Sequence, residues 1–256
     1  MIKSIHIPIV LLIYFSFAVA HAETIRIATD DNKWYPYSYE ENRVSMGMHI
    51  DIVSIALKNL GYNTTLTPLP WKRCLFSAQT GKYDAIISAS YQLKRADYLH
   101  YPHDAATTAK SEFRITQVTY VIVTNSSTPY EYDGNVKSLP GPVMAPFGYS
   151  VADDLKAQGV IVFETAGDVN SFKILTSRNG CIVTLPEIAD MMMQKPEYKG
   201  KLTISKKPFK SKSYFLAFSK KTTLSKNERS QIWNEIKTIR KNEDIRMALL
   251  KKYCLK

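Results

Sequence analysis

The spacing of hydrophobic residues divides the chain after position 22 into alternating strands and helices. A period of two over Thr24–Thr29 predicts a strand, and a period of about 3.6 up to Gly61 predicts the helix that follows. The alternation continues with a strand, a helix and a buried strand at residues 63–69, 70–80 and 84–90. Because two helices lie between three strands, we expect a parallel sheet with right-handed crossovers, whose ligands collect at the carboxyl ends of the strands.

A second unit of alternating strands and helices begins near residue 111. Residues 113–124 form a long β-rich run, and the loop that follows is rich in Ser, Pro, Gly and Asn. Strands and helices then alternate again, at residues 142–145, 150–158, 160–163, 168–177, 181–184, 186–194 and 202–205. A strand at Tyr214–Ser219 is expected to return the chain to the first unit, so two segments would connect the units.

The last part of the chain is predicted to be helical. Ser225 and Glu228 have the spacing of a capping box, which opens a helix, and a final helix follows from about Glu243. We therefore predict an α/β fold of two lobes, each a βα sheet, joined by a hinge of two segments. The predicted boundaries are 23–110 and 214–256 for the first lobe and 111–213 for the second.

The start of the chain has the pattern of a secretory signal peptide. Lys3 precedes an apolar run, and Ala20-His21-Ala22 matches the small-x-small pattern that a signal peptidase accepts. We expect residues 1–22 to be removed and the protein to be exported, with an uncleaved anchor helix as the alternative. The composition, 45% hydrophobic and 22% charged, is typical of globular proteins and excludes a disordered or rod-like chain. After residue 22 no apolar run approaches the ~18 residues of a membrane span, so we expect a soluble or peripheral monomer.

The cysteines limit the possible disulfide bonds, and the charge limits the classes of binding partner. Three cysteines, Cys74, Cys181 and Cys254, follow the signal pattern; they allow at most one bridge, for which Cys74 and Cys254 are the best candidates. The formal net charge is +11, and residues 195–221 carry nine lysines against one acid. Because these lysines lack the aromatic and Arg residues of nucleic-acid platforms, we expect a solvated positive surface that attracts anionic lipid or ligands, and no nucleic-acid partner.

Motifs of catalysis and metal binding are missing from the sequence. There is no G-x-S-x-G, no P-loop, no H-E-x-x-H and no paired-cysteine spacing. His100, His103 and Asp104 offer only a weak metal pattern, and Met191–Met193 is more typical of helix packing than of a copper site. We therefore expect no enzyme activity, no cofactor and no metal.

Several short patterns occur in a fixed order along the chain. TDDNKWYPY follows the first strand, GMHID opens the first helix, W-x-R opens the second, and GKYDAIISAS forms the third strand with KR four residues on. Together they resemble the bacterial extracellular solute-binding proteins of family 3, which have the two-lobed type II periplasmic binding fold. The resemblance covers nearly all of the chain after the signal pattern. It implies a periplasmic protein that captures a small polar solute, an amino acid or related carboxylate, and delivers it to an ABC-type permease.

The resemblance also implies a ligand site between the lobes. Arg95 falls where the family places the arginine that binds a ligand α-carboxylate, a task that suits a planar guanidinium with parallel donors. Ser88 and Ser90, at the carboxyl end of the third strand, match positions that offer backbone or hydroxyl groups to the same ligand. A surface arginine and plain strand-end serines are the alternatives.

Aromatic and charged residues of the first lobe extend this implied site. Trp34 and Trp71 match the two positions whose rings sandwich a ligand side chain, and Tyr37 would extend that wall. Asp30 falls where relatives use an acid or polar group to contact the far end of the ligand. Arg73 would add a second positive contact. The alternatives are core tryptophans, a loop-capping Asp30 and a solvated Arg73.

In the second lobe, Tyr149 and Ser150 precede a predicted helix whose free N–H groups would attract a carboxylate. Relatives bind ligand there through the backbone, although Ser150 could also simply cap the helix. The family usually has an aspartate in this lobe that holds the α-amino group, and here the nearest acid in the pattern is Glu187. This departure leaves the recognition of an α-amino group open.

Two other functions remain compatible with the resemblance. A stand-alone sensory or adaptor protein would present its ligand to a membrane receptor instead of a permease. A periplasmic enzyme of the dehydratase type would use the same two-lobed fold. Stoichiometric binding without product formation separates binding from catalysis, and ligand-dependent capture of a sensor or a permease separates the two binding roles.

Overall fold

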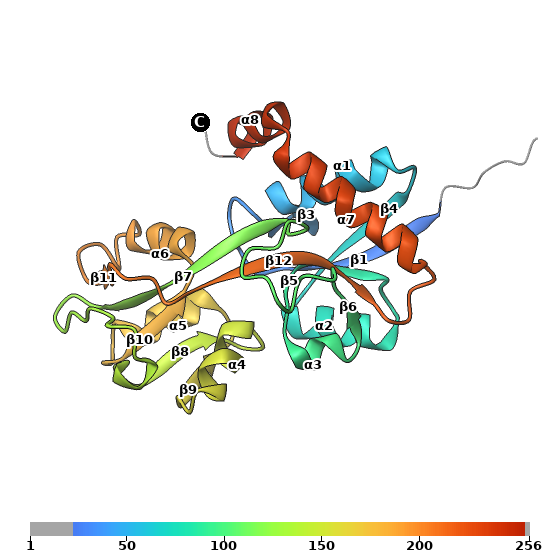
Figure 1. Ribbon diagram of the computed structural model, residues 1–256. Helices are drawn as coiled ribbons and strands as arrows, with labels where there is room; N and C mark the ends of the chain where they lie inside the picture. The colour runs from blue at the N-terminus through green and yellow to red at the C-terminus, as the bar shows by residue number, and fades with distance from the viewer. Residues whose placement is uncertain (1–22, 254–256) are drawn as a thin grey trace, which may run out of the picture.

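The computed structural model describes residues 23–253, and the expected signal peptide at residues 1–22 lies outside them. Two lobes lie side by side and are connected by two long antiparallel strands, β7 (Thr116–Asn125) and β12 (Lys210–Ser219) (Figure 1). The chain therefore has the two-lobed α/β architecture and the double connection that the sequence predicts.

The first lobe is built on a sheet in the order β4-β1-β5-β12. Strand β1 (Thr24–Asp30) pairs in parallel with β4 (Asn63–Leu69) and with β5 (Ala85–Ser90), as expected from the intervening helices. Strand β12 returns antiparallel to β5. The other elements of this lobe are β2 (Tyr39–Glu41), β3 (Val44–Met46), α1 (Met48–Asn59), α2 (Trp71–Thr80), α3 (Leu93–Ala96), β6 (Leu99–His100), α7 (Lys226–Lys241) and α8 (Glu243–Tyr253).

The second lobe continues the same sheet in the order β7-β10-β8-β9. Strand β10 (Cys181–Thr184) is antiparallel to β7 and parallel to β8 (Val143–Pro146), and β8 is parallel to β9 (Val162–Thr165). A short strand, β11 (Leu202–Ile204), pairs with β7. The helices of this lobe are α4 (Ser150–Ala157), α5 (Asp168–Leu175) and α6 (Pro186–Met193), with a 3-10 turn at Val136–Ser138.

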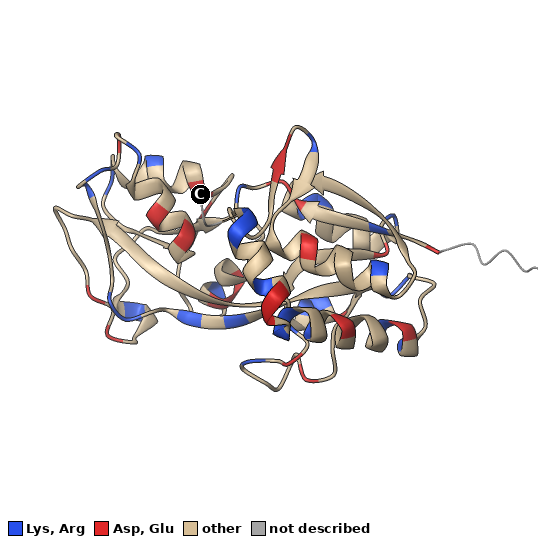
Figure 2. Cartoon of the chain, turned by 90° about the horizontal axis from the view of Figure 1, so that it is seen from above, with Lys and Arg blue, Asp and Glu red and all other residues tan. Residues whose placement is uncertain are grey.

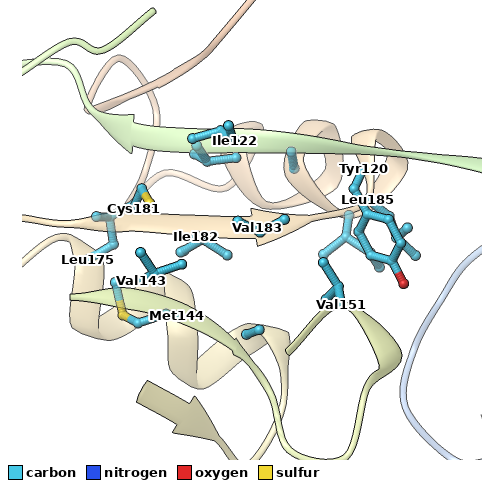
Figure 3. Close-up of a cluster of buried hydrophobic side chains, with 14 of the residues drawn as sticks. Tyr120, Ile122, Val143, Met144, Val151, Leu175, Cys181, Ile182, Val183 and Leu185 are labelled. Carbon is cyan, nitrogen blue, oxygen red and sulfur yellow. The ribbon is translucent and has the colours of Figure 1, made fainter. Parts of the chain in front are cut away.

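Each lobe has its own hydrophobic core. In the second lobe, Ile122, Ile182 and Val143 come from the neighbouring strands β7, β10 and β8 and are almost fully buried (Figure 3). In the first lobe, strand and helix residues such as Ile27 and Ile236 are equally buried. Continuous apolar runs suit strands that are covered on both faces, which explains why these strands could be recognised from the sequence.

Most predicted elements are confirmed to within a few residues. The capping box is present: the Glu228 N–H donates to the Ser225 hydroxyl at 3.3 Å, and the Ser225 N–H donates to the Glu228 carboxylate at 2.7 Å. Strand β12 begins at Lys210, so the boundary predicted between residues 213 and 214 falls inside one strand. The hairpin β2–β3 was not predicted, because strands of three residues carry little periodicity.

Cys74 and Cys254 are the two cysteines that the sequence analysis offers as candidates for a bridge. Cys74 is a free, buried thiol on α2, and Cys254 lies outside the described residues. The Cys74 thiol donates to the carbonyl oxygens of Thr29 and Leu69 at 3.2 and 3.3 Å. The thiol is therefore directed at strand ends inside the lobe, and burial raises its pKa above the ordinary value.

Charge is distributed less simply than the lysine-rich segment suggests. Lys and Arg lie along β12 and on the C-terminal helices, with Asp and Glu among them (Figure 2). Lys210 and Lys212 both contact the Asp154 carboxylate, at 3.1 and 2.8 Å, so part of the expected positive surface is neutralised within the second lobe. Within residues 23–253, no helix combines the length and apolar character of a membrane span.

Candidate functional site

A cavity lies between the lobes. It is formed by the carboxyl ends of β1 and β5, the start of α2 and the start of α4, where an α/β sheet is expected to bind ligands. Most of the residues that the resemblance assigns to a ligand site line it: Asp30, Trp34, Trp71, Ser88, Ser90, Arg95, Tyr149 and Ser150.

Arg95 is a buried cation in the wall of this cavity. Its side chain is 4% exposed, and none of the ion pairs among the described residues includes it. Nη1 donates to the carbonyl and hydroxyl oxygens of Ser90 at 3.1 and 3.2 Å, and Nη2 donates to the Gly148 carbonyl at 3.0 Å. These bonds use three of the five guanidinium donors and leave the positive charge for an anionic ligand to compensate.

Gly148 connects the two lobes at the same point. Its φ of 78° lies in the left-handed region that favours glycine. Its carbonyl accepts the hydrogen bond from Arg95 and a second one, at 3.1 Å, from the indole Nε1 of Trp71. A turn that only glycine adopts without strain thus fixes the distance between the start of α4 and the first lobe.

The first turn of α4 faces Ser90 across the cavity. The Ser90 hydroxyl donates to the Ser150 hydroxyl at 2.7 Å, and the Gln92 amide donates to the Ser150 carbonyl at 3.0 Å. Tyr149 occupies the N-cap position of α4, and no side chain caps the helix. The N–H groups at this helix start therefore carry partial positive charge next to Arg95, a combination that suits a carboxylate.

Indole rings form the walls of the cavity. Trp71 begins α2, is 6% exposed, and lies 5.3 Å from the Arg95 guanidinium. Trp34 is held in an isolated bridge with Ser38, and its ring lies 4.9 Å from His49 and 5.5 Å from Tyr214. Trp71 therefore belongs to the buried core of the first lobe and also lines the cavity.

Ser88 is positioned by a buried histidine. Its φ of 65° is uncommon for a residue other than glycine, and the register between β5 and β12 shifts beside it. The Ser88 hydroxyl and His49 Nδ1 are 2.9 Å apart. Burial lowers the pKa of His49 to about 3, so this imidazole is neutral at physiological pH and acts as a hydrogen-bond partner.

The end of the cavity at Asp30 is acidic. The Tyr149 hydroxyl of the second lobe donates to the Asp30 carboxylate at 2.9 Å, and the Asn32 N–H donates to it at 3.2 Å. Burial nevertheless raises the pKa of Asp30 to about 7. Asp168, at the start of α5, accepts a hydrogen bond from Thr184 at 2.7 Å, and burial raises its pKa to about 6.

Asp168 is the acid of the second lobe that the sequence analysis missed. Its charge contributes to the raised pKa of both Asp30 and Tyr149, so it lies close to them. The carbon that a side chain would add at Gly167 would lie 3.1 Å from the Asn32 side chain, which shows how closely the start of α5 approaches the first lobe. A helix start directly after a strand was the signal that could have identified this residue.

Three predicted site residues do not line the cavity. Arg73 is exposed on α2, two residues beyond Trp71 and so on the other side of the helix. Glu187 accepts a hydrogen bond from the Tyr37 hydroxyl at 3.3 Å, and the Tyr37 ring lies 5.4 Å from Trp34. Residues that the sequence analysis did not name line the cavity instead: Asn32, Ser38, Leu185 and Tyr214.

Within the described part of the chain, no group of three or more His, Cys, Asp or Glu side chains is arranged to hold a metal ion. The polar groups of the cavity are a guanidinium, hydroxyls and a carboxyl, and its walls are aromatic. This arrangement can bind a small organic solute with an anionic and a cationic or hydrogen-donating end.

Comparisons with known proteins agree with this geometry. Several solved structures share the fold. An ancestral arginine-binding protein bound to glutamine has a TM-score of 0.68 and 17% identity, covering 92% of this chain and 100% of its own. A histidine kinase sensor domain with similarity to periplasmic binding proteins has a TM-score of 0.73 and 15% identity, covering 91% and 96%.

The substrate-binding protein of an amino acid ABC transporter has a TM-score of 0.65 and 16% identity, covering 91% of this chain and 100% of its own. Among curated protein sequences, none matches. The family model of the bacterial extracellular solute-binding proteins, family 3, matches residues 25–254. That match spans both lobes, and the chain therefore belongs to family 3 of the bacterial extracellular solute-binding proteins.

Proposed function

We propose that this protein captures a small amino acid or related carboxylate in the cavity between its lobes, in the periplasm, and delivers it to an ABC-type permease. The observation that carries the proposal is Arg95, a buried guanidinium that lines the cavity beside a helix start and has no acidic partner among residues 23–253. A ligand carboxylate would meet parallel donors from Arg95 and partial positive charge from α4.

The charges of the cavity support a ligand with two unlike ends. Arg95 and the start of α4 offer positive charge at one place, whereas Asp30 and the neighbouring Asp168 offer carboxyls at another. The side chain of Tyr149 extends from the start of α4 to Asp30, so the two places are separated by the length of a tyrosine side chain. A zwitterion lying between Trp34 and Trp71 would match both.

Ligand capture and lobe closure are linked in this proposal. Hydrogen bonds from Arg95 to Gly148 and from Ser90 to Ser150 already join the lobes around the cavity. A ligand that contacts both lobes at once stabilises this closed arrangement relative to an open one. A permease can then distinguish the loaded protein by its shape.

The test is a thermal-shift screen of amino acids, small carboxylates and amines, followed by titration calorimetry of each hit. A solute that binds the folded protein raises its melting temperature by mass action. Arg95→Ala should weaken binding of a carboxylate ligand by about 2 to 5 kcal/mol, because a desolvated anion loses its partner. The matched control is Arg73→Ala, which removes an exposed arginine outside the cavity and should leave affinity within about twofold.

Unchanged affinity in Arg95→Ala, or an equal loss in Arg73→Ala, would contradict the proposed site. Analysis of each hit for product formation tests the binding role directly, since turnover would show an enzyme of the dehydratase type. A sensory role is the second candidate, favoured by the similarity to the histidine kinase sensor domain. Ligand-dependent capture of a membrane sensor instead of a permease would establish that role.

A further inference from the structure

A second cavity lies where the chain enters the connection between the lobes. It is bounded by α1, by the ends of α7 and α8, and by residues 114–117, which lead into β7. It shares no lining residue with the ligand cavity described above. Four basic side chains line it, Lys110, Arg114, Arg240 and Arg246, and no acid does so among the described residues; we refer to it as the basic cavity.

Arg114 brings a buried positive charge to this cavity. Its side chain is 7% exposed, and no ion pair among residues 23–253 includes it. Its Nη1 donates to the Ser111 carbonyl. Buried charges are normally paired, because removing a charge from water without a partner is unfavourable. Burial accordingly lowers the pKa of Arg114.

Arg240, in the last turn of α7, faces the same cavity. Its Nη2 donates to the Glu112 carbonyl at 2.9 Å, but its Nε–H is buried and has no hydrogen-bond partner in the described chain. Burial and the positive charge of Arg114 both lower the pKa of Arg240. Two guanidinium groups thus repel each other in a partly desolvated place, and one of them has a buried N–H donor without a partner.

The nearby acids are already engaged elsewhere. The Glu112 carboxylate contacts Lys241 at 2.5 Å and Lys237 at 3.9 Å. Arg246 is paired with Glu243 through two guanidinium nitrogens, one of them at 2.9 Å. Glu112 and Asp104 lie close enough to favour the charged form of Arg114, and Glu112 that of Arg240, but neither acid forms an ion pair with these arginines among the described residues.

We propose that the basic cavity binds a small oxyanion of the phosphate or sulfate type, held by Arg114 and Arg240. A tetrahedral oxyanion accepts several N–H bonds at once, and the planar guanidinium presents its donors in parallel pairs that match such oxygens. The anion supplies an acceptor for the Arg240 Nε–H and separates two like charges. Lys110, exposed at the rim, adds to the attraction.

The basic cavity is linked to the ligand cavity through His49, although the two cavities share no lining residue. His49 lines the basic cavity, and its Nδ1 lies 2.9 Å from the Ser88 hydroxyl, which lines the ligand cavity. Residues 115–117 of the basic cavity begin the strand that crosses between the lobes. Because the two cavities share no lining residue, the oxyanion site can be tested without knowing which solute the protein captures.

The experiment titrates inorganic phosphate into the full chain at constant ionic strength, with sodium chloride replacing phosphate, and follows the melting temperature and the heat of binding. Sulfate and acetate form parallel arms, which distinguish a tetrahedral dianion from any carboxylate. The expected result is saturable stabilisation by phosphate and sulfate that chloride does not reproduce.

Arg240→Gln should raise the phosphate concentration at half-saturation by about tenfold or more, because it removes charge-assisted hydrogen bonds. The control is Lys251→Gln, the same loss of charge on α8 outside both cavities, which should leave half-saturation within about twofold. Arg114→Gln should act like Arg240→Gln; if it fails to fold, Arg240→Gln decides alone.

Two results would overturn the oxyanion site. One is stabilisation by chloride equal to that by phosphate, which would show general screening of surface charge. The other is equal half-saturation in the wild type and in Arg240→Gln, which would place any bound phosphate elsewhere.

Discussion

Replacing Asp30 by Asn tests how much the ionised carboxyl of Asp30 lowers the free energy of unfolding. Burial raises the pKa of Asp30 to about 7, and the charges of Asp31 and Asp168 act in the same direction. Asparagine keeps an oxygen that accepts the hydrogen bond from the Tyr149 hydroxyl, but it cannot ionise. The substitution thus removes the charge and preserves the size of the side chain.

The sign of the effect follows from the two pKa values of Asp30. Below the unfolded value of 3.8 the carboxyl is protonated in both states, and it contributes nothing to the pH dependence. Between 3.8 and about 7 only the unfolded state releases the proton, so the free energy of unfolding falls as pH rises. Each pH unit contributes about 1.4 kcal/mol, so the wild type loses at most about 4 kcal/mol by neutral pH, and residual solvation of the carboxyl reduces this.

The assay is urea denaturation of the wild type and Asp30→Asn without added solute, at intervals from pH 4 to pH 8.5. The variant should unfold with a higher free energy at pH 8, by about 2 to 4 kcal/mol, and the difference should vanish toward pH 4. Asp190→Asn, which changes an exposed acid on α6, is the control and should show no such divergence. A constant difference at all pH values, or a less stable Asp30→Asn at pH 8, would refute the reasoning.

Three further substitutions test the site and the two cores. Asp168→Asn should lower the affinity for a ligand with a cationic end by about tenfold or more, measured by calorimetry, whereas Glu187→Gln should change that affinity by less than about twofold. A larger loss of affinity in Glu187→Gln than in Asp168→Asn would indicate that Glu187 belongs to the site. Ser225→Ala removes the capping box and should lower the free energy of unfolding by about 1 kcal/mol, and an effect no larger than that of Ser230→Ala would contradict this. Phe172→Ala leaves a cavity in the core of the second lobe and should lower the free energy of unfolding by about 3 to 5 kcal/mol, measured by urea denaturation. A loss under about 1 kcal/mol would show that the core relaxes around the smaller side chain.

The fold was largely predictable because its main strands can be recognised from the sequence. Residues 85–90 and 181–184 are buried along their whole length and are mostly apolar; Gly81 precedes the first strand, and Gly180 and Pro186 flank the second. The elements that were missed, α3, β6 and the hairpin β2–β3, have four residues or fewer. The turn of that hairpin uses Asn42 and Arg43 at positive φ, and Arg43 gives no local signal for such a conformation.

The site residues at the end of a single strand could be predicted from the sequence. The residues that enter the site because the two lobes approach each other could not. Ser90 ends a recognisable strand and Arg95 follows it by five residues, and the family resemblance implies a place for both in the ligand site. Tyr214 lines the cavity, and Asp168 lies near Asp30, only because β12 and α5 bring them beside the first lobe, a relation between segments far apart in sequence. Local periodicity carries no information on that approach.

The hydrogen bonds between the lobes determine what a ligand must add. Ser90 to Ser150 and Arg95 to Gly148 are contacts of the protein with itself, each worth about 0.5 to 1.5 kcal/mol net, or somewhat more where the guanidinium is the donor. A carboxylate that engages Arg95 makes charge-assisted bonds but competes for part of the same surface, so its gain is the difference between the two. Asp30 and Asp168 differ in kind, because their burial raises the free energy of the ionised form and a cation lowers it. Under the proposed function, selectivity among carboxylates should therefore arise at the acidic end of the cavity, and Arg95 should set the requirement for an anion.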